Sequence, residues 1–564
     1  MAHDRVDPPE RVNAAPRVAL AAASALALLV LILEARDQWF FNDDWGQWGA
    51  HRVGPRIDQP AQFFFGPHNG HWMTLNRVVF EGVYRMFGLR SYLPYLVPVF
   101  AVHVCAVWLL FALMRRAGVR PWLACAGAAM FAFFGSGAEV LTWADAFGFV
   151  APLAFATAQL MLVDHDGALD RRDAAGLALG VASIVSGGAS LTMIAVVAVS
   201  LILVRRWRAM VVATVLPAAL WCAWFVAIGH EGAHTFVDRA HAPNMAAYFW
   251  RSITSSVDSV TQLGASGVIV VALVVFAWWR PERWCTHGRA PVAALASGVV
   301  VFAAQTTLAR VNLGVELASS SRYLYVGGFL LLPFVMLAID EVVTLRPRVL
   351  PVALLFVVWA LVANAFAIDS FARAWGPRKQ AIRSAVATVA QLDGVDALPP
   401  GTRLVDPGRA FDPEWAPTVD VIRALRDHGD LPTFATPSEA DRLTWATRLL
   451  VRIAEQPGPP GKILGGVRVD SDVTTTAIGD GGCVDLVASR ATNRPPTVRL
   501  SDVDTVWIEA TTPTKLTVRL VSLIDHTIGE PKQFDVFGAV RLHVGVAHTE
   551  ALLAFDAPTL RLCG

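Results

Sequence analysis

Charged residues are scarce in this chain. They make up 16% of its 564 residues, whereas a soluble globular protein carries roughly 25%. Hydrophobic residues account for 55%, and the mean hydropathy is +0.48. This composition excludes an ordinary soluble domain and predicts an integral membrane protein. The net charge is only +1 and no basic tract occurs, so no nucleic-acid partner is expected.

Three further features are missing from the sequence. The first apolar run ends in Leu33-Glu34-Ala35-Arg36 without a small-residue cleavage site, so we expect it to be retained as a membrane span. No internal repeat is visible in the membrane region, which argues against transporters built from inverted repeats. Lysine does not occur before Lys379, and this preference for arginine, with the abundance of alanine, is typical of a high-GC bacterial genome.

Long apolar runs predict about eleven transmembrane helices, because a helix needs about 20 apolar residues to cross the bilayer core. The expected fold class is therefore an α-helical polytopic membrane protein. The runs on either side of Ser186-Gly187-Gly188 are the least distinct, and one long kinked helix is the alternative there. The predicted spans are 18–34, 92–114, 121–136, 147–163, 174–187, 189–204, 209–228, 265–279, 291–309, 323–340 and 349–367.

Arginines in alternate loops predict the orientation of these spans, since cytoplasmic loops are enriched in positive charge. The short loops 135–146 and 186–189 carry neither lysine nor arginine, so we place them outside. We therefore expect a protein of the plasma (inner) membrane, with residues 1–17 in the cytoplasm and residues 368–564 outside it. The arginines of the loops expected inside are Arg115, Arg116, Arg120, Arg171, Arg172, Arg205, Arg206, Arg208, Arg280, Arg283, Arg289, Arg346 and Arg348.

Outside the transmembrane domain expected at 18–367, the chain changes character. The first outer loop, 36–91, contains an amphipathic stretch at 72–87 that suits a helix lying at the membrane interface. Residues 368–460 show helical patterns separated by Pro-Gly turns, and we expect a mixed α/β segment. Residues 461–564 alternate between apolar and polar side chains and predict an antiparallel β-sandwich.

Only two cysteines, Cys483 and Cys563, fall in the polar C-terminal third of the chain. In an oxidising compartment outside the cytoplasm such a pair favours a disulfide. Two unpaired buried thiols are the alternative.

An acidic pair, Asp43 and Asp44, follows the first apolar run within Phe41-Asn42-Asp43-Asp44-Trp45. Carboxylates at a membrane surface are costly to place and are often functional. Outside the cytoplasm no nucleotide-activated sugar is available, so an activated donor must be carried by a lipid. One carboxylate then suffices to deprotonate an acceptor hydroxyl, and its neighbour orients the acceptor or holds a metal ion. The alternative is an N-terminal cap of a short helix.

A histidine pair follows within His68-Asn69-Gly70-His71-Trp72. His68 and His71 are candidates for contact with a phosphate or another part of the substrate. A divalent metal, Mg²⁺ or Mn²⁺, held together with the acidic pair is a second interpretation, although two histidines alone are weak evidence for it. Polar residues at the membrane interface are the structural alternative.

Two more segments expected outside carry polar side chains. The first opens a late span, where an arginine fork suits a phosphate oxyanion and tyrosines can line a prenyl groove; interface anchoring is the alternative. The second segment is the loop between the third and fourth predicted spans, which could complete an acidic pocket for the acceptor or form an ordinary polar turn. The residues are Arg322, Tyr323 and Tyr325 in the first segment, and Glu139, Trp143 and Asp145 in the second.

In this order, the motifs resemble those of the GT-C superfamily, integral-membrane glycosyltransferases that use polyprenyl-phosphate sugars such as decaprenyl-phosphate sugars. The likeness is to bacterial members related to protein O-mannosyltransferases and covers about residues 18–367. It implies a GT-C fold and an inverting transfer with Asp43 or Asp44 as base and Arg322 near the lipid phosphate. The matching elements are Asn42-Asp43-Asp44-Trp45, Gly70-His71-Trp72-Met73-Thr74-Leu75, Ala138-Glu139-Val140-Leu141-Thr142-Trp143 and Arg322-Tyr323-Leu324-Tyr325.

The chain also departs from the pattern of that superfamily. The proline expected in the second element is Thr74, and Ser186-Gly187-Gly188 stands where relatives often have Ser-Lys-Glu. The C-terminal region resembles, in layout only, carbohydrate-binding appendages of actinobacterial cell-wall transferases. The expected function is transfer of a sugar from a polyprenyl-phosphate donor to a cell-envelope glycan, glycolipid or protein. The alternatives are a transporter or flippase of lipid-linked precursors and a non-catalytic glycan-binding scaffold.

Overall fold

The chain divides into two compact units. Unit 1 comprises Met1–Phe40 and Gln59–Pro377, and unit 2 comprises Phe41–Asp58 and Arg378–Gly564. The first outer loop expected at 36–91 is thus shared between the units. The structure is a computed structural model that describes residues 14–49, 52–232, 240–279, 281–404, 416–454, 467–469, 473–479, 483–488, 495–501, 503, 505–546 and 548–563. Most of the expected N-terminal segment 1–17 therefore lies outside the described residues.

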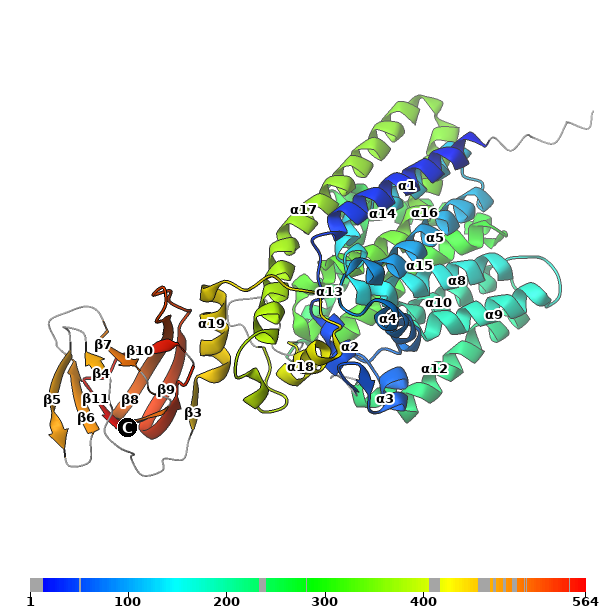
Figure 1. Ribbon diagram of the computed structural model, residues 1–564. Helices are drawn as coiled ribbons and strands as arrows, with labels where there is room; N and C mark the ends of the chain where they lie inside the picture. The colour runs from blue at the N-terminus through cyan, green and yellow to red at the C-terminus, as the bar shows by residue number, and fades with distance from the viewer. Residues whose placement is uncertain are drawn as a thin grey trace, which may run out of the picture. The chain divides into compact units, whose positions relative to one another are not determined.

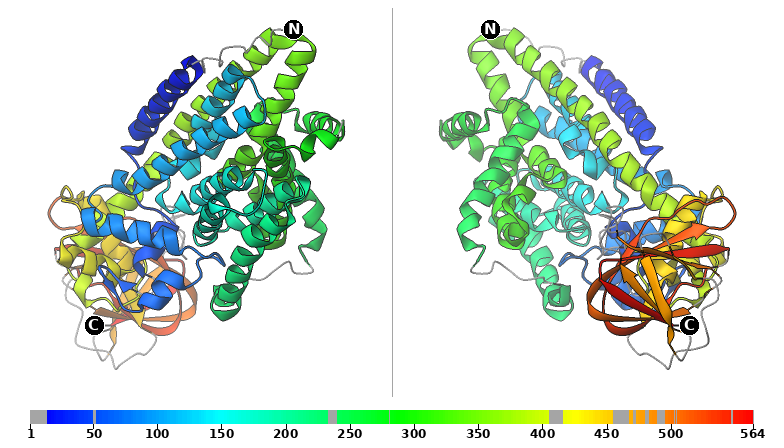
Figure 2. Two further views of the ribbon diagram at one scale, coloured as in Figure 1. Left: turned by 90° about the vertical axis from the view of Figure 1, so that its right-hand side faces the viewer. Right: turned by 90° about the vertical axis from the view of Figure 1, so that its left-hand side faces the viewer.

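Unit 1 is built from helices (Figures 1 and 2), several of which pack side by side in a bundle that includes α5, α8, α10, α15 and α16. Proline at the first turn helps to start several of them, because its missing N–H group has no partner there in any case. Its helices are α1 Ala15–Ala35, α3 Pro60–Phe65, α4 Thr74–Phe87, α5 Leu93–Arg116, α6 Pro121–Ala132, α7 Ala138–Leu141, α8 Phe147–Val163, α9 Arg171–Ile184, α10 Ala189–Leu203, α11 Trp207–Met210, α12 Leu216–Ala227, α13 Met245–Thr261, α14 Ser266–Trp278, α15 Arg289–Arg310, α16 Ser321–Leu345 and α17 Leu350–Ala390, the last of which extends into unit 2.

Eight helical segments of the described chain are long and apolar enough to cross a membrane. A ninth is counted if Ala242–Thr261 and Ser266–Trp278, which are bent by 91° at a short break, form one span. The polytopic membrane region is therefore confirmed with eight or nine candidate spans. The eight are Ala15–Ala35, Leu93–Arg116, Pro121–Leu141, Ala144–Val163, Trp207–Ala227, Arg289–Leu313, Ser321–Leu345 and Pro347–Ala390.

The predicted number of eleven is higher because of the runs at 174–187 and 189–204. They form two separate helices, α9 and α10, of 14 and 15 residues rather than one long kinked helix. At 1.5 Å per residue they are about 21 to 23 Å long, shorter than the roughly 30 Å of a bilayer core. The predicted span 349–367 and the helical pattern after residue 372 are both parts of α17.

Helix α4 buries polar residues together with the apolar Phe80, Val83 and Tyr84, and it exposes apolar side chains. Its polar residues Asn76, Arg77 and Glu81 are buried, whereas Val78 and Met86 are 49% and 70% exposed. The expected amphipathic helix therefore forms, and its outer face is apolar. Such a face suits contact with the lipid interface better than contact with water.

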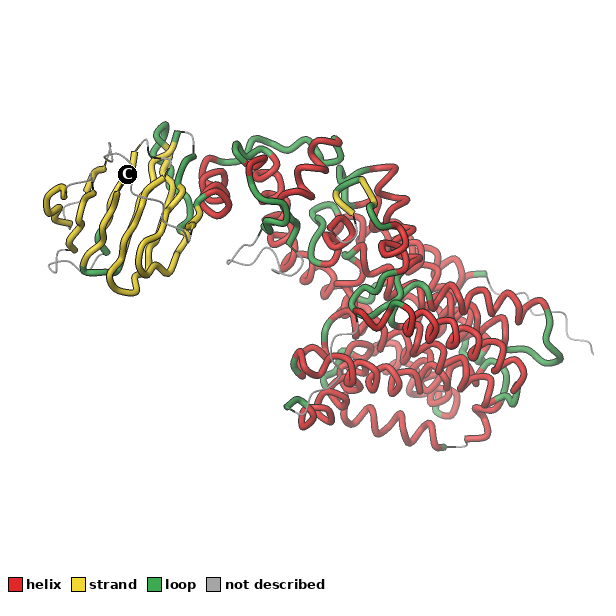
Figure 3. The backbone as a smooth tube through the Cα atoms, turned by 90° about the horizontal axis from the view of Figure 1, so that it is seen from below, coloured by secondary structure: helices red, strands yellow, loops and turns green. Residues whose placement is uncertain are grey.

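Unit 2 contains all the described strands, drawn in yellow in Figure 3. Its N-terminal part is the short helix α2 (Asp43–Gly49) and the hairpin of β1 (Arg52–Val53) and β2 (Arg56–Ile57). The hairpin packs on α18 (Val419–His428), and its turn requires glycine: Gly54 has φ +56°, and a Cβ there would lie 2.7 Å from that of Ala424. Residues 41–58 are thereby built into the C-terminal unit.

The expected β-region is an antiparallel sheet, with β8 at its centre. The first half of β8 pairs with β9 and β11, and its second half pairs with β9 and β10, with an irregular register near Ala510. Alternate β8 residues such as Val506, Ile508 and Leu516 are fully buried, as the period of two predicts. The strands after helix α19 (Glu439–Leu450) are β3 Arg452–Ala454, β4 Val467–Val469, β5 Val473–Gly479, β6 Cys483–Ala488, β7 Thr497–Ser501, β8 Thr505–Ser522, β9 Lys532–His543, β10 Thr549–Phe555 and β11 Thr559–Cys563.

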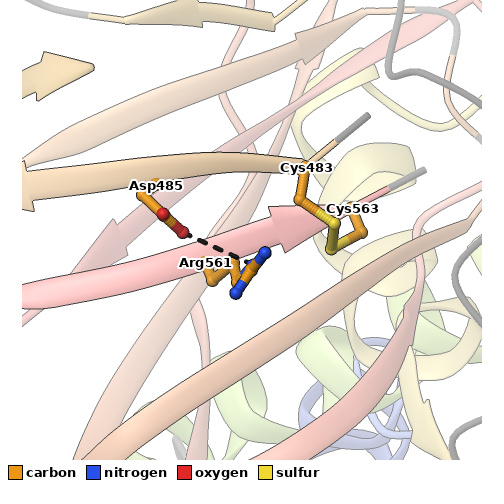
Figure 4. Close-up of a disulfide and its surroundings, with 4 residues drawn as sticks. All are labelled: Cys483, Asp485, Arg561 and Cys563. Atoms are coloured by element: carbon orange, nitrogen blue, oxygen red, sulfur yellow. Dashed lines mark ion pairs between the residues drawn. A yellow bond between two sulfur atoms is a disulfide. The ribbon is translucent and has the colours of Figure 1, made fainter. Parts of the chain in front are cut away.

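A disulfide joins Cys483 and Cys563, the pair that the sequence favoured. The two residues face each other across the β6–β11 ladder, and a neighbouring ion pair, Arg561 with Asp485, joins the same strands (Figure 4). The disulfide therefore links β11 covalently to its neighbour β6.

Candidate functional site

The loops of unit 1 gather into two groups at opposite ends of its helices. At one end, which we call the arginine end, ion pairs join loops that the sequence assigned to the cytoplasm. Helix α5 and helix α8 both run from this end to the other, which we call the site end. The pairs at the arginine end are Arg116–Asp164 at 3.1 Å, Arg120–Asp340 at 2.7 Å, Arg206–Asp173 at 3.1 Å and Arg283–Glu341 at 2.5 Å.

The histidine pair lies at the site end in a tight two-residue turn. The backbone N–H of His68 donates to the carbonyl of His71 over 3.0 Å, and that of His71 donates back over 2.8 Å. Between them Asn69 and Gly70 have φ values of 50° and 78°, as in the Asn-Gly turn that suits a hairpin. Residues directly opposite each other project to the same side. The turn therefore presents both imidazoles on one face.

A buried polar group, which we call the His68 cluster, forms around Asp145. Nε2 of His68 lies 3.7 Å from Oδ2 of Asp145, and both side chains are at least nine-tenths buried. The Asn76 amide donates to Oδ1 of the same carboxylate over 3.0 Å. Arg77, on the next position of α4, is also buried; burial lowers the pKa of its guanidinium to about 10, and the charge of Asp145 opposes that shift. Arg77 stays protonated at neutral pH, so Asp145 lies in the field of a fixed positive charge.

Two glycines between α9 and α10 allow this region to close around His71. A Cβ at Gly188 would lie 2.5 Å from the imidazole of His71, and a Cβ at Gly187, whose φ is +157°, would overlap the carbonyl of Gly148 in α8. Any side chain at 188 would displace the imidazole. Thr74 joins the residue after this turn to α3: its hydroxyl accepts from the indole N–H of Trp72 and donates to the Phe64 carbonyl.

Arg322 opens α16 at the site end, beside the loop that holds Glu139 and Trp143. Nη1 of Arg322 lies 3.9 Å from Oε1 of Glu139, and its guanidinium carbon is 5.9 Å from the centre of the Trp143 ring. The hydroxyl of Ser321 accepts from the backbone N–H of Glu139, which fixes the loop to the helix. The structure thus brings together Arg322, Glu139 and Trp143, and the same loop leads to Asp145.

The two tyrosines that follow Arg322 are buried among the helices of unit 1. Tyr323 is 8% exposed and packs edge-on against Phe302. Tyr325 is fully buried, and its hydroxyl lies 2.8 Å from Nδ1 of His103. Tyr325 therefore has the environment of a core residue between α5 and α16 rather than of a residue lining a groove.

A second arginine at the site end was not foreseen from the sequence. Arg310 is the last residue of α15, and its guanidinium donates to the carbonyl of Asn69 in the histidine turn over 3.4 Å. Among the described residues no acidic side chain forms an ion pair with Arg310. Tyr248, fully buried in α13, lies within electrostatic range of both Arg310 and Arg322. An arginine directly after a predicted span was the available signal.

The acidic pair belongs to unit 2, where the two aspartates differ in burial. Asp44 is fully buried in the first turn of α2, and its carboxylate accepts from the backbone N–H of Phe41 over 3.2 Å. Lys379, also fully buried and not foreseen from the sequence, places its ammonium 4.1 Å from the centre of the Phe41 ring. Asp43 is only partly buried. Asp44 thus bonds to the backbone just before α2, and Asp43 is the more accessible carboxylate.

One group within unit 1 has ligand atoms close enough to hold a metal ion. These atoms, from His165, Asp170 and Asp173 at the arginine end, lie within 4.8 Å of one another. Arg172 and Arg206 form ion pairs with the two carboxylates. Because the arginines already compensate the negative charge, this group is better explained as a structural network.

The fold and the spans define a polytopic membrane protein with a C-terminal antiparallel β-sheet region. No protein-family model matches the chain, and no curated protein matches it significantly.

Proposed function

We propose that the protein is a membrane glycosyltransferase of the GT-C type. In this proposal it transfers a sugar from a polyprenyl-phosphate donor to a cell-envelope glycan, glycolipid or protein on the extracytoplasmic face. The observation that carries the proposal is the pair Arg310 and Arg322 at the site end, next to the His68 cluster and at the end of an apolar helical bundle.

A lipid-linked sugar phosphate needs two features that this end of unit 1 combines. Its prenyl chain needs an apolar surface, which the helices of unit 1 offer to the membrane. Its departing phosphate needs cationic hydrogen-bond donors, and arginine offers them in a fork that matches phosphate oxygens. Arg310 makes no ion pair among the described residues, and the recorded Arg322–Glu139 distance is 3.9 Å. The guanidinium of Arg310 can therefore turn toward an incoming anion at low cost.

Asp43 is the proposed general base. In the transfer step the acceptor hydroxyl gives its proton to the Asp43 carboxylate while its oxygen forms a bond to the anomeric carbon. The bond from that carbon to the phosphate oxygen breaks, and the phosphate leaves with the electron pair. A single displacement of this kind inverts the anomeric centre. Asp43 is preferred to Asp44 because Asp44 is fully buried and bonded to the backbone of Phe41.

The His68 cluster has the proposed role of orienting a hydroxyl or phosphate of the substrate. Oδ2 of Asp145 lies 3.7 Å from Nε2 of His68, and the Asn76 amide donates a hydrogen bond to Oδ1 of the same carboxylate. A ring oriented in this way presents its other nitrogen in a defined direction. The Gly188 contact does the same for His71 by limiting where its imidazole can lie.

The first test is sugar transfer by the purified full-length protein in detergent, with labelled polyprenyl-phosphate sugars as donors. The second is mass spectrometry of the glycans that cells lacking the protein fail to make. Turnover in detergent, where no sidedness exists, separates a transferase from a flippase. Chelation by EDTA in the same assay tests the Mg²⁺ or Mn²⁺ requirement that the sequence left open.

Asp43→Asn is the decisive variant. We expect it to lower the transfer rate by about 10²- to 10⁴-fold, the usual contribution of a general base, without loss of folded protein. Asp44→Asn should instead reduce the yield of folded protein. The control is Asp37→Asn, which alters an exposed aspartate nearby in the sequence and should behave as wild type. Full activity of Asp43→Asn would remove this residue from catalysis.

A further inference from the structure

A cavity lies within unit 2, and its lining includes none of the residues assigned to the proposed transferase function. The cavity has a volume of about 420 Å³ and lies between α19 with the segment after α17 on one side and the strands β3, β8 and β9 on the other. Pockets of roughly 300–1,000 Å³ are the size that holds small organic ligands. Its polar walls come from Asp393, Arg442, Arg452, Thr505 and His543, and the rest of the lining, including Leu450, is largely apolar.

Three side chains of the sheet wall are placed together by strand register. His543 on β9 lies directly opposite Arg452 on β3 and directly opposite Thr505 on β8. Residues opposite each other share one face of a sheet, and so do residues two apart on one strand. Thr505 Oγ1 lies 3.2 Å from Nδ1 of His543. Arg541, two residues before His543, is therefore on the same face.

The sheet wall carries positive charge that the protein does not balance. Among the residues that the structure describes in unit 2, no acidic side chain forms an ion pair with Arg452 or Arg541. The positive charge of these arginines affects the pKa of two neighbours, His543 and Lys532. Burial lowers the pKa of His543, and the charges of Arg452 and Arg541 lower it further. Burial likewise lowers the pKa of the Lys532 ammonium, with a second contribution from Arg452.

The helical wall opposite carries one guanidinium and two carboxylates. Glu439 accepts two hydrogen bonds from the guanidinium of Arg442, over 2.7 and 2.6 Å, and Asp393 adds negative charge within electrostatic range of the same arginine. The excess of cations is therefore confined to the sheet side of the cavity.

We propose that this cavity binds a compact organic anion, whose carboxylate or phosphate group is held by Arg452 with Thr505 and His543 as hydrogen-bond partners. The apolar part of the lining then contacts the body of the ligand. Arginine suits this role because its planar fork can bond two oxygens of one carboxylate or phosphate. Arg442 is already engaged by Glu439 and closes the opposite wall.

The experiment measures binding to the full-length protein in detergent by isothermal titration, with four probes: glucuronate, glucose 6-phosphate, neutral glucose and inorganic phosphate. We expect the two charged sugars to bind and glucose not to bind at the same millimolar concentrations. Inorganic phosphate should bind more weakly than glucose 6-phosphate, since it lacks a body for the apolar lining. A preference between glucuronate and glucose 6-phosphate distinguishes a carboxylate from a phosphate as the natural group.

Arg452→Gln is expected to weaken binding of the charged probes about tenfold to a hundredfold, which is the worth of one charge-assisted hydrogen bond. Thr505→Val, which removes one hydrogen-bonding group without changing charge, should weaken it less. The matched control is Arg519→Gln, which alters an exposed arginine of β8 that does not line the cavity. Unchanged melting temperatures and an intact Cys483–Cys563 disulfide show that the variants fold.

Three outcomes would overturn the proposal. The first is binding of glucose as tight as that of the charged sugars. The second is equal affinity of wild type and Arg452→Gln for the charged probes. The third is no binding of either charged sugar to the wild-type protein.

Discussion

The two ends of unit 1 both gather arginines, but they hold them differently. At the arginine end the guanidinium groups lie 2.5 to 3.1 Å from carboxylate oxygens, as in Arg283–Glu341 and Arg206–Asp173. At the site end Arg310, among the described residues, donates only to a carbonyl, over 3.4 Å. Arg310 at the site end is thus held less tightly than the arginines of the other end.

This difference separates a structural role from a functional one. A close ion pair that joins two loops fixes those loops, and breaking it leaves a charge without compensation. A loosely held cation next to buried polar groups is costly for the fold, and a bound anion offsets that cost. Variants at the arginine end should therefore change stability, and variants at the site end should change transfer.

Asp164→Ala is expected to have the largest effect. The Asp164 side chain is almost fully buried at the arginine end, 3.1 Å from the guanidinium of Arg116. It accepts hydrogen bonds from Nδ1 of His287 over 2.7 Å and from the Gly288 backbone N–H over 2.8 Å. Removing one partner of a buried pair costs about 3–5 kcal/mol. Thermal unfolding in detergent measures the loss, and transfer per folded molecule should be unchanged.

The matched control for Asp164→Ala is Asp166→Ala. Asp166 pairs with the same histidine at 2.9 Å but its side chain is 94% exposed. An exposed pair contributes about 1 kcal/mol or less. Equal destabilisation by the two variants would show that burial is not what distinguishes the arginine end.

Arg310→Gln and Arg322→Gln are expected to lower kcat/KM for transfer by about 10²- to 10³-fold, because each removes a cationic donor to the departing phosphate. The melting temperature of Arg310→Gln should stay close to that of wild type, because Arg310 makes no ion pair among the described residues. Steady-state kinetics with a polyprenyl-phosphate sugar measures the first effect and thermal unfolding the second.

Arg251→Gln is the control at the same end of unit 1. Its guanidinium donates to Glu316 over 2.6 Å and to Ser319, so it is held as the arginines of the other end are. Loss of transfer in Arg251→Gln as large as in Arg310→Gln, or a melting temperature of Arg310→Gln as low as that of Asp164→Ala, would contradict the contrast between the ends.

Gly188→Ala tests the packing of the site end. The added methyl group would lie 2.5 Å from the His71 imidazole, so the ring must move. Overpacking of this kind costs about 1–3 kcal/mol, and displaced His71 should also slow transfer. Gly267→Ala in α14, where nothing lies within 4 Å of the new methyl group, is the control and should leave both properties unchanged. Wild-type transfer by Gly188→Ala would show that the position of His71 does not matter.

The membrane class and the strands could be predicted from the sequence because both depend on local patterns. Apolar runs mark buried or lipid-facing helices, and alternation at 505–521 marks β8. The number of spans could not be predicted from run length alone. The runs 174–187 and 189–204 are apolar, yet their helices end where Gly187 and Gly188 pack on Gly148 and His71.

The candidate site could be predicted only in part. Motifs identified His68, Asp145 and Arg322 one at a time, but their neighbours depend on contacts between distant segments, such as Asn76 with Asp145 across 69 positions. Arg310 and Lys379 were missed because nothing local distinguishes them. The contact of the Tyr325 hydroxyl with His103, across 222 positions of the sequence, could likewise not be predicted from local patterns.

Asp170→Asn should have the smallest effect, and it tests whether even the exposed edge of the arginine end works through charge. Asp170 caps α9, and hydrogen bonds from the side chain and backbone of Arg172 lower the pKa of its carboxyl to about 2. Asparagine is also a good N-cap, so this variant removes the charge and keeps the cap. An aspartate has a pKa near 3.9 in an unfolded chain, so the ionised carboxylate stabilises the fold above about pH 4, and this contribution disappears as the pH falls toward 2. The melting temperature of the variant should therefore be slightly below that of wild type from pH 7 to about 5, and the difference should shrink below about pH 4. A difference that stays constant down to pH 3 would mean that the exposed charge of Asp170 contributes nothing to the arginine end.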